Sequence, residues 1–82
     1  MQTTLRLTVG ASMTIPPINR HAYPELDAIL WDRAEDYVDP EIAFRLYEER
    51  WRFIDQKRLN EDEVALIKKL ARIYGHGHLL VA

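Results

Sequence analysis

Two histidines near the end of the chain have the spacing of a simple metal-binding pair. His76 and His78 flank Gly77, and His21 is a distant third imidazole. Imidazole is a common zinc ligand, but a His-x-His pair alone is a weak motif, and the chain has no cysteine and no HExxH-type companion. We therefore interpret these histidines as exposed residues of a glycine-rich helix exit and predict no metal site.

Four carboxylates also lie close together, namely Asp32, Glu35, Asp36 and Asp39. Such a group can hold a cation or do acid–base chemistry, but this one lacks the spacing and the central glycine of an EF-hand loop. Nucleophilic catalysis has little support, because the chain has no cysteine, only one serine (Ser12) and no glycine-rich phosphate loop. The sequence predicts a solvated turn with a helix cap, no cofactor and a protein that is not an enzyme.

Arg50 is the charged residue whose position calls most for a partner. In a helix over about 40–54, it lies near the middle of a broad apolar arc. We expect a buried stem and a guanidinium that pairs with an acid such as Asp36 or Asp39, because buried charges are normally paired. The alternative is that its planar fork anchors an anionic ligand or a carboxylate of a partner.

Aromatic residues at the edge of the same arc indicate a protein-binding surface. The arc spans roughly 200°, which is wider than one neighbouring helix covers, so helices pack on both flanks or part of the arc contacts another protein. Tryptophan and arginine dominate the binding energy of many interfaces. We predict that the domain contacts another protein or a second copy of itself through Arg50, Trp51, Phe44 and Arg45.

Basic residues around the last helix raise an alternative, a DNA-binding regulator of the helix-turn-helix type. This alternative uses Lys57, Arg58, Lys68, Lys69 and Arg72. Against it, the first turn of that helix reads Glu61-Asp62-Glu63, which phosphate would repel, and the preceding loop lacks the glycine common in the motif. Nucleic acid is therefore the less favoured partner.

Two helices separated by a short loop should position these residues. Asp39 and Pro40 are typical of a helix start, and the apolar pattern continues to about Ile54. Asn60 and Glu63 have capping-box spacing, which predicts a second helix over 61–74 that ends at a left-handed Gly75. The architecture expected is therefore a small, mainly α domain centred on a helix-loop-helix pair.

The remaining segments complete a three-helix arrangement. A short helix is expected to open at Pro24, after an extended segment with two prolines at 15–19. Residues 5–9 alternate as in a short strand, with 79–81 as the only comparable extended segment. We expect residues 1–13 to form a leader or that short strand, and 14–82 to form one helical domain.

Composition limits the classes of protein that fit. With 82 residues there is room for one domain, and 48% hydrophobic with 29% charged residues is typical of a folded chain. A net charge of −2 excludes a uniformly basic nucleic-acid-binding surface. No apolar run reaches the roughly 20 residues of a membrane span. We expect a cytoplasmic, non-catalytic regulatory or accessory protein, antitoxin-like or subunit-like, that acts through protein–protein contact.

Overall fold

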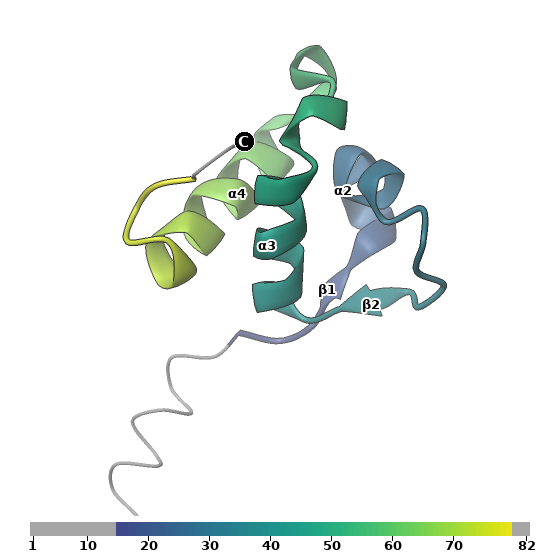
Figure 1. The fold of residues 1–82 in the computed structure, drawn as a ribbon, viewed down its shortest axis with the longest axis horizontal. Helices are drawn as coiled ribbons and strands as arrows, with labels where there is room; N and C mark the ends of the chain where they lie inside the picture. The colour runs from purple at the N-terminus through teal and green to yellow at the C-terminus, as the bar shows by residue number, and fades with distance from the viewer. Residues whose placement is uncertain (1–14, 80–82) are drawn as a thin grey trace, which may run out of the picture.

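Three α-helices and a short two-stranded sheet form the part of the chain that the computed structural model describes, residues 15–79 (Figure 1). Helix α2 spans Pro24–Ile29, α3 spans Pro40–Glu49 and α4 spans Glu61–Tyr74. Single turns of 3-10 helix lie at Arg20–Ala22 (η1), Trp51–Phe53 (η2) and Gln56–Arg58 (η3). The predicted mainly α fold with three helices is confirmed.

Strands β1 (Ile18–Asn19) and β2 (Tyr37–Val38) pair antiparallel, with Ile18 opposite Val38 and Asn19 opposite Tyr37. The sequence gives no signal for this sheet, because two-residue strands are too short to show a period. The strand expected at 5–9 lies outside the described residues, as do residues 80 and 81. Leu79 is described and packs partly buried against the core outside any strand.

Helix α3 contacts both α2 and α4, which lie on either side of it in Figure 1. Its broad apolar arc is therefore shared between two neighbours, which is one of the two arrangements that the width of the arc predicts. The core combines apolar side chains from all three helices with one from each strand, Leu30 directly after α2 and Ile54 directly after η2. They are Leu26, Ile29, Leu30, Ala43, Phe44, Leu46, Tyr47, Leu66, Ile67, Leu70, Ala71, Ile18, Val38 and Ile54.

Local capping residues fix the starts of the two long helices. The Asp39 carboxylate accepts hydrogen bonds from the N–H groups of Glu41 and Ile42, and Pro40 occupies the first helical position. The Asn60 side chain accepts a 2.9 Å hydrogen bond from the N–H of Glu63. Both starts are confirmed at the predicted residues.

The end of α3 differs from the prediction. Its α-helical part stops at Glu49 rather than near Ile54, and Arg50 leads into the tighter turn η2. After that turn Ile54 enters the core, and the N–H of Asp55 donates a 2.8 Å hydrogen bond to the buried Glu25 carboxylate. These two tertiary contacts end the helical path, and neither is visible in the local apolar pattern.

The end of α4 is at the predicted residue but has a different geometry. Gly75 has a φ of −122°, so it is not left-handed, whereas His76 and Gly77 have positive φ values of 54° and 88°. Glycine is nevertheless needed at position 75, since a Cβ there would lie 2.2 Å from the carbonyl oxygen of His78 and 2.6 Å from Cζ of Phe44. A glycine is needed at position 75 because neighbouring atoms come too close for a Cβ, and not because of its φ angle.

Candidate partner-binding surface

Arg50 joins the end of α3 to the end of α2. Its guanidinium donates two 2.9 Å hydrogen bonds to the Asp32 carboxylate and one of 2.6 Å to the carbonyl oxygen of Ile29. The predicted pairing with an acid is therefore right, but the acid is Asp32 rather than Asp36 or Asp39. Both terminal nitrogens of the Arg50 guanidinium donate hydrogen bonds within the chain, so the structure favours pairing over a free anion anchor.

Two aromatic side chains lie exposed beside this ion pair. Trp31 is 58% exposed and Phe53 is 54% exposed. Their ring centroids are 5.4 Å apart with planes at 84°, an edge-to-face arrangement, and the Arg50 guanidinium lies 4.2 Å from the centroid of the Trp31 ring. The Arg52 guanidinium lies 5.0 Å from the Phe53 centroid. The rings are therefore held in place although they are largely open to water.

The Arg50–Asp32 pair stays ionised across the physiological range. The hydrogen bonds from Arg50 lower the pKa of Asp32 to about 2, and burial opposes this shift only in part. Hydrogen bonding with Asp32 likewise raises the pKa of Arg50. The clamp that holds Trp31 is thus insensitive to pH changes near neutrality.

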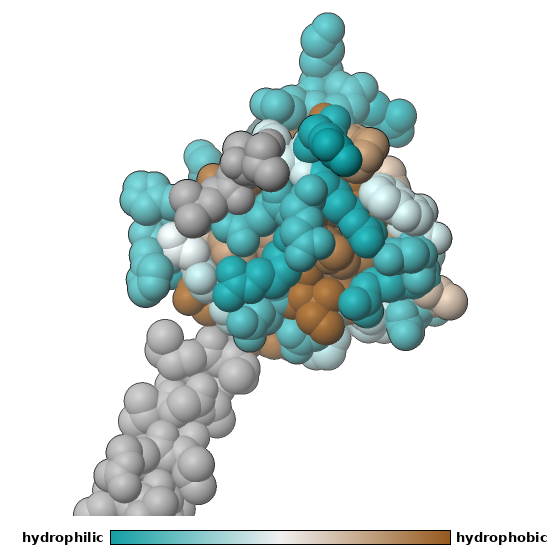
Figure 2. All heavy atoms as spheres, in the orientation of Figure 1, coloured by the Kyte–Doolittle hydropathy of each residue, from teal (hydrophilic) through white to brown (hydrophobic). Residues whose placement is uncertain are grey.

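A shallow hollow lies along α3 and is also lined by Arg33, which belongs to the segment that carries Trp31. Its volume is about 440 Å³, and Ile42 and Leu46 supply apolar side chains to its lining. The other lining residues are charged, namely Arg33, Asp39, Glu41, Arg45 and Glu49. Figure 2 shows apolar surface, in brown, open near α3 and bordered by hydrophilic residues. We call Trp31, Ile42, Leu46 and Phe53, with the charged row Glu41, Arg45, Glu49 and Arg52, the α3 stripe.

The residues predicted to bind a partner are only partly brought together at this surface. Arg45 is exposed and pairs at 3.5 Å with both Glu41 and Glu48. Trp51 is half-buried against the core. Phe44 is 0% exposed, and its ring centroid lies 6.2 Å from that of Tyr74 on α4. The placement of Phe44 at a surface is therefore wrong, because α4 covers that flank of α3.

Trp31 and Phe53 are the surface residues that sequence reasoning missed. The predicted helix over 40–54 placed Phe53 within its buried arc, but the 3-10 turn after Arg50 turns this ring outward. Trp31 follows the end of α2 and belongs to no periodic segment. Its position directly after the buried pair Ile29 and Leu30 was the available signal, although a weak one.

A buried carboxylate links the helices behind the stripe. Glu63 is 0% exposed and accepts hydrogen bonds from the N–H groups of Glu25 and Leu26, at 3.2 and 2.8 Å, and from the Tyr47 hydroxyl at 2.7 Å. Burial and the adjacent Glu63 raise the pKa of Tyr47 far above its usual value. The capping box is thus half formed, because the carboxylate of Glu63 satisfies the first amides of α2 instead of capping its own helix.

A second buried carboxylate fixes the turn after η2. Glu25 is buried, accepts the hydrogen bond from the N–H of Asp55, and lies 3.4 Å from Nε of Arg58. Glu25 and Glu63 therefore both bind groups of the fold. Neither is open to a substrate, so these carboxylates are structural.

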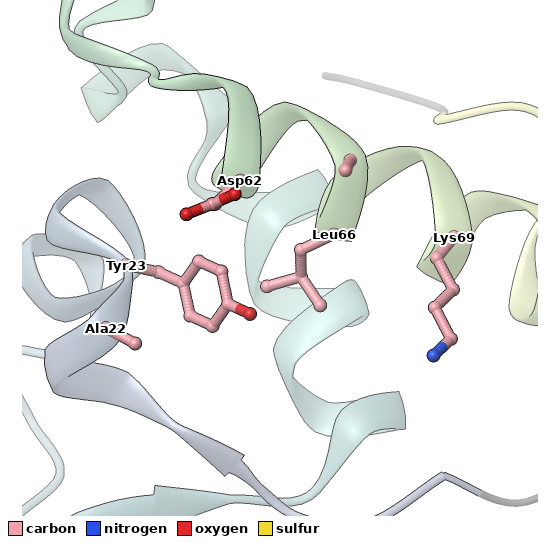
Figure 3. Close-up of a pocket in the computed structure, with 6 residues that line it drawn as sticks. Ala22, Tyr23, Asp62, Leu66 and Lys69 are labelled. Carbon is pink, nitrogen blue, oxygen red and sulfur yellow. The ribbon is translucent and has the colours of Figure 1, made fainter.

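The basic residues of the DNA-binding alternative do not gather at one site. Lys57 and Arg58 lie in η3, where Arg58 contacts Glu25, whereas Lys68, Lys69 and Arg72 are exposed on α4. Lys69 borders a groove of about 350 Å³, lined also by Ala22, Tyr23, Asp62, Ala65 and Leu66. Figure 3 shows Tyr23 pointing from the start of α2 toward α4, with Asp62 and Lys69 at opposite ends of the groove. Acid and base are therefore mixed along it.

The candidate metal ligands are also dispersed. His76 and His78 are exposed after α4, while Nε2 of His21 lies 2.9 Å from the Asp36 carboxylate. Within residues 15–79, no three histidine or acidic side chains are grouped as a metal site would require. Three of the clustered acids have separate roles. Asp32 pairs with Arg50, Asp36 pairs with His21, and Asp39 caps α3.

Comparisons with models of protein families, with curated proteins and with solved structures find no match to this chain. None of the helices in the described part of the chain has the length and apolar content needed to cross a bilayer. The geometry of the described surface is therefore the basis for assigning a function.

Proposed function

We propose that this domain is a small non-catalytic regulatory or accessory protein that acts by binding another protein chain through the α3 stripe. The observation that carries the proposal is the exposed, edge-to-face pair of Trp31 and Phe53. Large exposed apolar side chains that lie next to one another mark interaction sites more often than isolated ones do. Tryptophan and arginine, which meet here, are also the residue types most enriched among binding hot spots.

The side chains of this surface are held in fixed positions, which supports the proposal. Arg50 is locked by Asp32 and the Ile29 carbonyl, and it holds the Trp31 ring from one face. A side chain already held in its bound position loses less conformational entropy on association. Aromatic rings that were exposed only by chance would need no such support.

Truncation of Trp31 is expected to remove the partner. We expect full-length chain immobilised as bait to retain a protein from lysate of the native host, and Trp31→Ala bait to retain it at least about ten-fold less, as for a hot-spot residue. The measurement is quantitative mass spectrometry of the bound fraction. Arg72→Ala, an exposed truncation on α4, is the matched control and should leave capture unchanged.

The same measurement separates the alternatives. Equal recovery of every protein by the wild-type and Trp31→Ala baits would contradict the proposal. Recovery of nucleic acid that disappears with Lys68→Ala and Lys69→Ala would favour the DNA-binding alternative instead.

A further inference from the structure

The charged row of the α3 stripe has an order that points to the identity of its partner. Glu41, Arg45, Glu49 and Arg52 alternate in sign along α3 and η2. At 100° per residue Glu41, Arg45 and Glu49 fall within an arc of about 80° on α3, so these three form one row, and Arg52 continues the alternation of charge in η2. Glu41, Arg45 and Glu49 line the same hollow, and the Arg52 guanidinium lies over the Phe53 ring.

A row of this kind is complementary to its own reversed copy. If a second α3 packs antiparallel about a two-fold axis near residue 47, Glu41 faces Arg52 of the second copy, and Arg45 faces Glu49 of the second copy. Both pairs then occur twice by symmetry, so four oppositely charged pairs form. A parallel arrangement would instead place each charge opposite its like.

The apolar row obeys the same symmetry. Ile42 and Phe53 are also centred near residue 47, so Ile42 of one copy meets Phe53 and the adjoining Trp31 of the other. Ile42, Trp31 and Phe53 are the exposed apolar side chains of the stripe, and Leu46 lies beside the axis. One packing therefore covers the exposed rings and matches the charges together.

We propose that the α3 stripe is covered by a second copy of this chain in an antiparallel, two-fold symmetric dimer. The inference rests on the proposed function and names the partner of the same surface. The intrachain contacts of Arg45, at 3.5 Å to Glu41 and Glu48, are loose and exposed, so they leave the row available for pairing across the axis.

Charge reversal tests this arrangement. Sedimentation equilibrium of the full chain at low salt should give twice the chain mass for the wild type. Glu41→Arg and Arg52→Glu each turn two attractive pairs into repulsive ones and should weaken the dimer at least about ten-fold. An equimolar mixture of the two variants restores every pair, so it should form a heterodimer as stable as the wild-type dimer.

Matched reversals on the outer face of α4, Glu61→Arg and Lys68→Glu, should leave the dimer unchanged, and circular dichroism verifies that every variant is folded. A wild-type chain that stays monomeric would overturn the inference. So would a dimer whose dissociation constant is unchanged by both Glu41→Arg and Arg52→Glu. If the chain is monomeric while Trp31→Ala still abolishes capture of a different protein, the proposed function stands and only the second copy is excluded.

Discussion

Replacement of Glu63 with alanine is expected to lower the free energy of unfolding by about 3–5 kcal/mol, the range for breaking a buried charged interaction. The carboxylate is fully buried and accepts hydrogen bonds from the first amides of α2 and from the Tyr47 hydroxyl. Alanine would leave these three buried donors without an acceptor, and each unsatisfied group costs about 1–3 kcal/mol. Urea unfolding followed by circular dichroism measures the difference.

Glu61→Ala is the matched control for Glu63→Ala. Glu61 lies in the same first turn of α4 but is exposed, so its loss should change stability by no more than about 0.5 kcal/mol. Tyr47→Phe removes only one donor and should cost less than Glu63→Ala. Equal, small effects for Glu61→Ala and Glu63→Ala would show that the carboxylate does not join the helices as described.

Replacement of Arg20 with alanine should have an effect of similar size, about 3–5 kcal/mol. This buried guanidinium binds the Asp27 carboxylate at 2.5 Å and donates to the carbonyl oxygens of Asp27, Leu30, Arg33 and Glu35. These carbonyls belong to the end of α2 and the segment that follows it. Alanine would remove these hydrogen bonds from the segment that carries Trp31 and Asp32. The midpoint of thermal unfolding should therefore shift to a lower temperature.

The geometry of the guanidinium is the essential feature of Arg20. Arg20→Lys keeps the charge but replaces a planar fork with a single ammonium, so it should recover only part of the lost stability. Arg33→Ala, an exposed arginine in the same segment, is the control and should be nearly neutral. A lysine variant as stable as the wild type would mean that charge alone, and not the set of carbonyl contacts, explains the role of Arg20.

Helix starts were predictable because their signals are local. Asp39 with Pro40, and Asn60 with the amide of Glu63, complete their caps within three residues, so the sequence contains all the participants. The end of α3 was not predictable in the same way, because it depends on Glu25, which is 30 positions from Asp55 along the chain. For the same reason, the carboxylate of Glu63 was assigned to its own cap rather than to α2.

The surface was harder to predict than the fold. A helical wheel shows that α3 has a wide apolar arc, but which flank remains open depends on where α4 crosses it. That crossing buries Phe44, whereas Phe53 is exposed because the 3-10 turn η2 turns its ring outward. Arg50 was identified from its place in the arc, whereas its partner Asp32 lies after α2 and is brought close only by tertiary packing. The role of Arg20 was not predicted, because most of its acceptors are backbone carbonyl oxygens, and every residue type has one.

Photo-crosslinking from position 31 tests the central claim, that the α3 stripe binds a protein chain, most directly. Benzoylphenylalanine incorporated in place of Trp31 keeps an aromatic side chain at the surface and reacts with whatever covers it. The same group in place of Lys68, on the exposed side of α4, is the control. We predict a protein adduct from position 31 and none from position 68, with twice the chain mass if the partner is a second copy. The account would be contradicted by protein adducts from position 68 alone, or by none from either position in cells of the native host.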